Sequence, residues 1–204
     1  MLLKLFIFEI MLFISYIFYR FLARQCNLRV KNKSFERHSK DIIDLLIYGF
    51  IIFIFIFFKN NANYFDKSYI IYFFISLVMF GLILEIPGVD STVPNFKNWN
   101  SNKIVAVISL LVLTYVNGKS NFVLNKRNGG LMVYLIIFSM VTTITSYQKN
   151  KMKTFHPHHW QIFWFLSLIM VPNLLKTKIL SAMYVSFFAH GIIAHSAASI
   201  LKDE

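Results

Sequence analysis

The sequence predicts an all-α protein, a polytopic transmembrane helical bundle with seven spans, or six if one short span does not cross. Two observations predict this class. Hydrophobic residues make up 57% of the 204 residues and charged residues only 15%, whereas a soluble domain is about half apolar and about a quarter charged. The apolar residues also occur in long unbroken blocks, without the alternating or helical spacing of a surface that faces water. Such blocks are typical of helices that face lipid.

Seven apolar segments supply the predicted spans, which together form one transmembrane domain over residues 1–204. A hydrocarbon core of about 30 Å requires about 20 apolar residues in a helix. The first block is expected to be a signal anchor, because it is too long for a cleaved signal peptide and no small-residue cleavage site follows it. The seven spans are expected at residues 2–23, 42–58, 68–86, 103–116, 130–147, 160–175 and 180–201.

Charge and turn residues delimit the first three spans. Residues 24–40 contain six basic residues and a single acid, Glu36, so the positive-inside rule places this loop in the cytosol. The second span follows as a run of Ile and Phe over 42–58. The third ends at Glu85 and the turn-forming pair Pro87-Gly88.

The remaining four spans are separated by polar loops. The 103–116 segment is short for a bilayer, which leaves six spans as the alternative. The 130–147 segment contains Ser and Thr residues that can hydrogen-bond a neighbouring helix. The segments 160–175 and 180–201 are joined by very few residues and must form an antiparallel hairpin. Pro172 is expected to kink or end the sixth helix.

Successive spans alternate in direction, so helix counting brings distant polar residues to one membrane face. With residues 24–40 in the cytosol, the N-terminus lies outside and the C-terminus inside. Asp66 is expected at the opposite face. The shared face collects the residues at the start of the second span, the end of the third, the start of the sixth and the end of the seventh, namely Asp41, Asp44, Glu85, His156, His158, His159 and His195.

A histidine cluster at this face is the candidate site. Imidazoles of His156, His158, His159 and His195, with carboxylates of Asp41, Asp44 or Glu85 alongside, are ligands that suit Zn²⁺ or Fe²⁺. A metal-bound water would then attack an ester or amide beside the lipid headgroups. The alternative is that the histidines and Trp160 pack at the interface, where amphipathic rings prefer to lie, and that His190 and His195 make polar contacts within the helix hairpin.

Composition bounds the partners and the location. The formal net charge of +12 does not indicate nucleic acid, because the basic residues lie mostly between apolar blocks, where they meet anionic lipid headgroups. Membrane lipid is therefore the expected partner, and no protein partner can be derived. Cys26 is the single cysteine, so an intrachain disulfide is excluded. The many Phe, Ile, Lys, Asn and Tyr residues are typical of AT-rich genomes, such as those of protists or large DNA viruses. A large DNA virus as the source would place the chain in a host membrane.

The stretch His156-Pro157-His158-His159-Trp160, followed by Pro172, Ser181, Gly191 and His195, resembles the membrane part of fungal LCCL-domain proteins. The likeness covers about the final quarter of the chain. It implies a polytopic helical fold and carries no settled activity. The chain is also similar to alkaline ceramidases and adiponectin receptors, which are seven-helix hydrolases with a His-bearing last helix. Their last helix carries histidines four residues apart, whereas His190 and His195 are five apart and would turn about 140° away from each other on a helix.

The sequence therefore favours a multi-pass integral membrane protein with a non-catalytic role, in which its polar face organises helices, lipids or partners. The alternative is a metal-dependent membrane hydrolase that uses His156, His158, His159 and His195 on a lipid-like substrate. A transporter is a third class, favoured if His190 and Glu9 line a continuous cavity.

Overall fold

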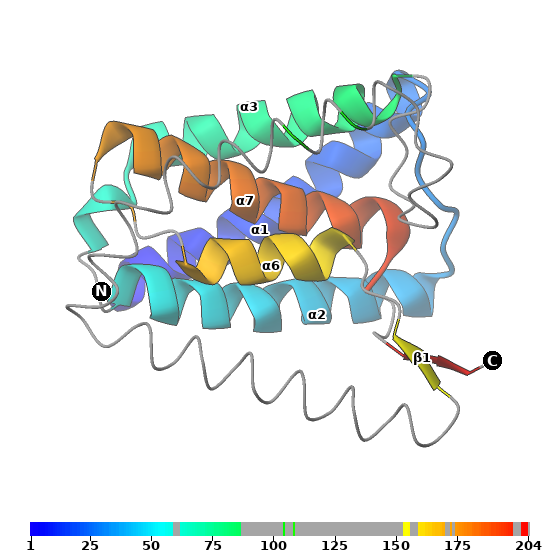
Figure 1. The fold of residues 1–204 in the computed structure, drawn as a ribbon, viewed down its shortest axis with the longest axis horizontal. Helices are drawn as coiled ribbons and strands as arrows, with labels where there is room; N and C mark the ends of the chain where they lie inside the picture. The colour runs from blue at the N-terminus through cyan, green and yellow to red at the C-terminus, as the bar shows by residue number, and fades with distance from the viewer. Residues whose placement is uncertain are drawn as a thin grey trace.

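Helices form the body of the molecule. The computed structural model describes residues 1–58, 62–86, 104, 108, 153–155, 159–169, 172, 174–197 and 201–203. Within these residues, five α-helices are present: α1 (Leu2–Gln25), α2 (Phe35–Phe53), α3 (Lys67–Leu84), α6 (His159–Ile169) and α7 (Leu175–His195). A π-helical turn over Ile54–Phe58 and a short 3₁₀ helix over Ala62–Tyr64 follow α2. The five helices lie roughly side by side in one bundle (Figure 1).

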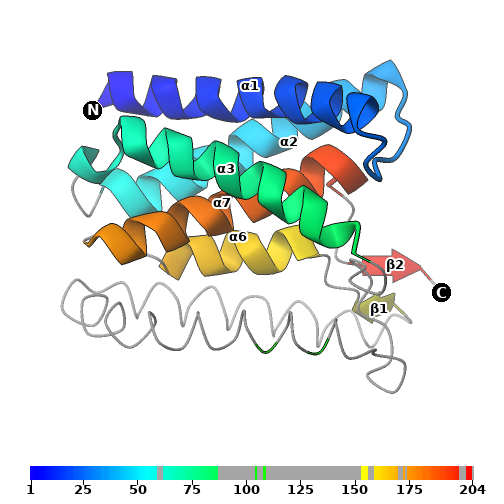
Figure 2. The ribbon, with the colours of Figure 1, turned by 90° about the horizontal axis from the view of Figure 1, so that it is seen from above.

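Helix α7 lies at the centre of this bundle. It contacts α1, α2, α3 and α6, and Figure 2 shows it between α3 and α6. Helices in lipid gain little from hydrophobic burial and associate through close packing, which small residues permit. The buried small residues of α7 are Ser181, Ala182, Ser186, Ala189, Gly191 and Ala194.

Two glycines bring α1 close to its neighbours. A Cβ atom built on Gly49 of α2 would lie against the Leu12 side chain, and one on Gly81 of α3 would lie against the Tyr19 hydroxyl. Any larger residue would force these side chains to shift. Near the other end of α1, Phe8 packs at ring-centroid distances of 5.5 and 5.6 Å from Phe53 and Phe65, contacts that are each worth about 0.5–1.5 kcal/mol beyond burial.

The second helix begins earlier than the sequence predicts. Helix α2 starts at Phe35, although the predicted span starts at residue 42. The reason is the helix cap, because the Ser34 side chain accepts a hydrogen bond from the backbone N–H of Arg37. Glu36 also lies in the first turn, where its negative charge interacts favourably with the helix dipole. Polar residues assigned to the loop therefore form the first turns of α2.

The ends of the last two helices also differ from the prediction. Helix α6 ends at Ile169, before Pro172, and the predicted end at residue 175 is wrong because α7 already begins at Leu175. Helix α7 stops at His195, since Ser196 adopts a left-handed φ of 82°. Residues Leu201–Asp203 instead form strand β2, which pairs antiparallel with β1 (Lys153–Phe155).

Three described helices, α1, α3 and α7, are long and apolar enough to cross a membrane. They confirm the all-α class and support a membrane protein. Helix α2 does not join this set, because charged residues occupy its first turns. The predicted spans 103–116 and 130–147 lie outside the described residues, except for Ile104 and Ile108, which are helical.

The helix directions agree with the predicted alternation. Both views show α1, α3 and α7 finishing at the same end of the bundle at which α2 and α6 begin (Figures 1 and 2). We call this the basic end, because it includes the cationic residues 24–40. The C-terminus lies at the same end, and the N-terminus lies at the other.

Candidate functional site

A buried ion network occupies the basic end. Asp41 of α2 is fully buried, and the Lys33 Nζ atom lies 2.8 Å from its Oδ2 atom. The Arg37 Nε atom lies 3.2 Å from its Oδ1 atom. A buried charge requires such partners, because removing one of them leaves an uncompensated ion at a cost of about 3–5 kcal/mol. The ion pairs of Asp41 therefore stabilise the fold.

The same cations cap the end of α7, where helix carbonyls have no partner within the helix. Lys33 Nζ donates to the carbonyl oxygens of Ile192 and Ile193, both at 2.8 Å. Arg37 donates to the carbonyl of Ala197 at 2.9 Å. A positive charge at a helix C-terminus also interacts favourably with the helix dipole. The loop after α1 is thus tied to the chain's last described helix.

Burial and charge shift the titration of two groups in this network. Burial lowers the pKa of Lys33, and Asp41 opposes that change. Burial, followed by the cations Arg20 and Lys33, lowers the pKa of His38. The His38 Nδ1 atom lies 2.7 Å from the Tyr16 hydroxyl, so a neutral imidazole links α2 to α1 at neutral pH.

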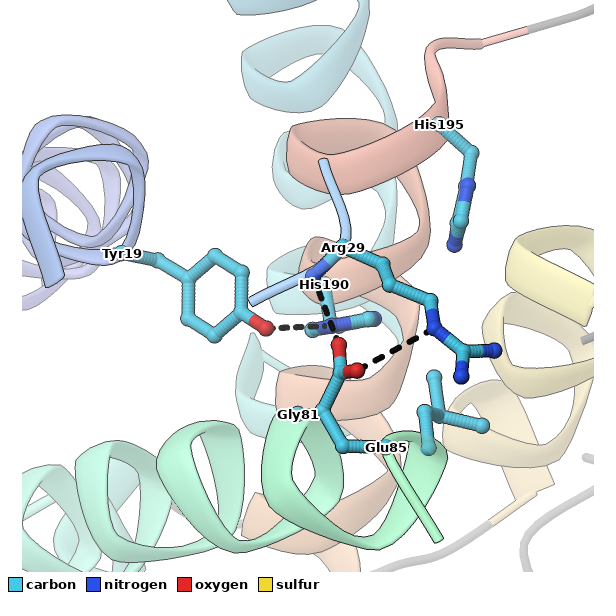
Figure 3. A pocket seen from close by; sticks show the side chains of 7 residues that line it. Tyr19, Arg29, Gly81, Glu85, His190 and His195 are labelled. Carbon is cyan, nitrogen blue, oxygen red and sulfur yellow. Dashed lines mark hydrogen bonds and ion pairs between the residues drawn. The ribbon is translucent and has the colours of Figure 1, made fainter. Parts of the chain in front are cut away.

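A small cavity of about 50 Å³ lies beside this network (Figure 3). Such a volume has room for a few water molecules. Side chains from α1, the following loop, α3 and α7 surround it. Its lining residues are Tyr19, Arg29, Gly81, Leu84, Glu85, His190 and His195.

A buried tyrosine–histidine pair forms the inner wall of the cavity. The Tyr19 hydroxyl lies 2.8 Å from the His190 Nε2 atom, and both residues are 1% exposed. Gly81 is required for this contact, because a Cβ at this position would occupy the place of the Tyr19 hydroxyl. The ring of Phe80 packs edge-on against His190 at a centroid distance of 5.1 Å.

An ion pair forms the outer wall. The backbone N–H of Arg29 donates to Glu85 Oε1 at 2.6 Å, and the Arg29 Nε atom lies 3.1 Å from Glu85 Oε2. The side chains are 63% and 28% exposed, so the cavity meets the surrounding medium on this side. The pair joins the loop after α1 to the C-terminal end of α3.

The structure corrects one geometric inference about the last helix. Five-residue spacing predicts that His190 and His195 face different ways, yet both line the cavity and their ring centroids are 6.1 Å apart. His195 is the last residue of α7, and its side chain reaches back to the cavity rim (Figure 3). The angle between the two Cα positions around the helix axis therefore does not by itself determine where the two imidazole rings lie.

The predicted metal ligands are only partly within the described residues. His156 and His158 lie outside them, and His159 opens α6 without a described side chain. Of the described candidates, His195 and Glu85 line the cavity, Asp41 lies in the ion network, and half-buried Asp44 lies one turn further along α2. Within the part of the chain that the structure describes, no three His, Cys, Asp or Glu residues form a group suited to a metal ion. The Zn²⁺ or Fe²⁺ site stays a prediction.

Sequence reasoning did not single out Tyr19, Gly81 or Arg29. Glycine and tyrosine are common in apolar helices, so nothing in their local pattern marks a contact with His190. Arg20 offers a signal, since an arginine within an apolar block requires acceptors. It donates to the carbonyl of Lys31 at 2.8 Å, which indicates that the loop folds back over the helix ends.

Comparisons with known proteins add no family to this description. No model of a protein family, no curated protein and no solved structure matches the chain.

Proposed function

We propose that the chain is a seven-span integral membrane protein with a non-catalytic role, in which its basic end gathers anionic lipid headgroups. One observation carries this proposal. The buried acid Asp41 is neutralised within the fold by Lys33 and Arg37, whereas Arg24, Lys31 and Lys40 are exposed. The surface that remains is cationic.

The apolar surface supports a location in lipid. Helix α1 exposes large hydrophobic side chains along its length, including Phe6 at 62% and Phe21 at 63%, and α3 exposes Ile71 and Ile75 at 56% each. Patches of this extent on a soluble protein mark binding sites or aggregation. Here they continue to the basic end, where Lys and Arg meet headgroup phosphates, each contributing about 1 kcal/mol near an anionic leaflet.

Parity supports seven spans over six. Helix α3 finishes and α6 begins at the basic end, so a chain that crosses with both must cross an even number of times between them. Residues 103–116 and 130–147 then either both span or both fail to span. Their apolar character favours both.

The lipid proposal is tested in vesicles of mixed phosphatidylserine and phosphatidylcholine. We expect wild-type protein, extracted with its surrounding lipid into polymer nanodiscs, to be enriched in phosphatidylserine relative to the vesicle. The triple variant Arg24→Gln, Lys31→Gln, Lys40→Gln should lose most of this enrichment. The matched control is Lys67→Gln, which removes an exposed cation at the other end. Equal lipid composition in wild type and triple variant would contradict the proposal.

The metal-dependent hydrolase is the second candidate, because α6 begins and α7 ends at the basic end and so brings His159 and His195 to one side. Elemental analysis of the same purified protein separates the two. Stoichiometric Zn or Fe that is lost in His158→Ala would favour the hydrolase and contradict the non-catalytic role.

A further inference from the structure

The outer rim of the cavity presents a fixed arginine. Glu85 holds Arg29 through its backbone N–H and its Nε atom, while 63% of the side chain remains exposed. We propose that Arg29, together with His195, binds the phosphate group of one anionic phospholipid at this rim. This site rests on the proposed function. The proposed function describes a general attraction of anionic lipids, and the site adds one defined position at which a single lipid binds.

The orientation of Arg29 suits a phosphate. A guanidinium carries five N–H donors in a planar fork that matches phosphate oxygens. Because the Glu85 carboxylate contacts the Nε atom of Arg29, the two terminal guanidinium nitrogens of Arg29 point away from that carboxylate, as Figure 3 shows. His195 extends from the end of α7 toward the same rim. Two side chains that can donate hydrogen bonds, from different elements, therefore line the same cavity.

The electrostatics of this end permit a bound anion. The carbonyls at and just after the end of α7 would repel a phosphate, but Lys33, Arg20 and Arg37 donate to those of Ile192, Ile193 and Ala197. Glu85 is the opposing charge at the rim. It both orients Arg29 and limits the affinity for a second anion, so its neutralisation is a direct test of the site.

The surroundings favour a lipid over a free ion. The cavity volume of about 50 Å³ accommodates phosphate oxygens in place of water, but no acyl chain. Apolar side chains exposed on the last turns of α1 and at the end of α3 supply a surface for the acyl chains. At the end of α3 these are Leu82 at 46%, Ile83 at 36% and, just after the helix, Ile86 at 44%, and on α1 they are Phe18 at 39% and Phe21 at 63%.

Native mass spectrometry of the delipidated, detergent-purified chain tests this site. Titration with phosphatidic acid should give one saturable adduct, and phosphatidylcholine a weaker one. Arg29→Gln should weaken the phosphatidic acid adduct about tenfold or more, the usual effect of losing a hydrogen bond to a charged group. Glu85→Gln, which keeps an oxygen to accept from the Arg29 N–H, should strengthen it. The control Lys67→Gln removes an exposed cation that does not line the cavity and should leave the adduct unchanged.

The outcomes separate this site from the general proposal. Equal adducts in wild type and Arg29→Gln would overturn the site, even if the triple variant still loses lipid enrichment in nanodiscs. Competition by inorganic phosphate at equal concentration would also overturn it, because the apolar surface would then contribute nothing. If the triple variant loses phosphatidylserine enrichment but the wild-type protein forms no saturable phosphatidic acid adduct, the site is overturned and only the general attraction of anionic lipids remains. A defined adduct that requires Arg29 supports the site.

Discussion

At the scale of single residues, the candidate site depends on pairs of side chains that are distant in sequence. Tyr19 and His190 are 171 positions apart and form a buried hydrogen bond. Gly81 makes room for it from a third helix. His190 was expected to make polar contacts within the helix hairpin, but nothing in the local pattern marked Tyr19 of α1 as its partner or Gly81 as their neighbour. Asp41 was predicted at this face as a possible metal ligand, and the structure pairs it with Lys33 and Arg37.

Tyr19→Phe tests the importance of the buried pair. The substitution removes the hydroxyl and leaves the His190 Nε2 atom without this partner, so the free energy of unfolding in detergent should fall by about 1–3 kcal/mol. Tyr72→Phe is the matched control, because it removes a hydroxyl from a half-buried position on α3 that does not line the cavity. Equal unfolding free energies for the two variants would show that the Tyr19–His190 bond adds no stability.

At the scale of helices, caps decide where elements begin. Ser34 starts α2 earlier than the apolar pattern suggests. Asp66 caps α3 by accepting from the backbone N–H of Tyr69 at 3.0 Å, and its other oxygen lies 2.7 Å from Lys178 Nζ of α7. The sequence placed Asp66 at the far face, and there it both caps α3 and pairs with Lys178 of α7.

Acid titration tests the Asp66 cap. Burial would raise the pKa of Asp66, but hydrogen bonds from Lys178, Ser68 and Tyr69 outweigh it and lower the pKa from 3.8 to about 2. A lowered folded pKa contributes stability that is present above the unfolded value and is lost as the pH falls through the folded value. The free energy of unfolding should therefore fall between about pH 4 and pH 2 in wild type.

Asp66→Asn should show a smaller fall over the same range, since asparagine caps a helix as well as aspartate but carries no charge to titrate. Circular dichroism with a denaturant series at each pH gives the measurement. Parallel curves for the two proteins would show that the Asp66 charge contributes nothing.

At the scale of the whole molecule, sidedness follows from helix direction. Cys26 is the single cysteine and is exposed at the basic end. In intact cells we expect a membrane-impermeant maleimide to leave it unlabelled until the membrane is permeabilised, because the positive-inside rule predicts a cytosolic location for the cationic loop.

Two cysteines placed in a Cys26→Ser background complete the topology. Asn63→Cys lies in the 3₁₀ helix Ala62–Tyr64, just before α3, which begins at the far end of the bundle, and this cysteine should be labelled from outside. Ser120→Cys should be labelled from outside if residues 103–116 span. Labelling of Ser120→Cys only after permeabilisation would exclude seven spans and leave five.

The amino-acid sequence by itself determined the helical class, the lipid-facing surface and the gathering of polar residues at one end. Those features follow from the length of the apolar blocks, from the basic loop and from counting alternating helices, all of which are local or additive along the chain. The tertiary structure alone decided which polar groups meet there. The partnership of Asp41 with Lys33, of Tyr19 with His190 and of Arg29 with Glu85 depends on how helices rotate about their axes and how loops fold back over their ends, and packing between helices sets both.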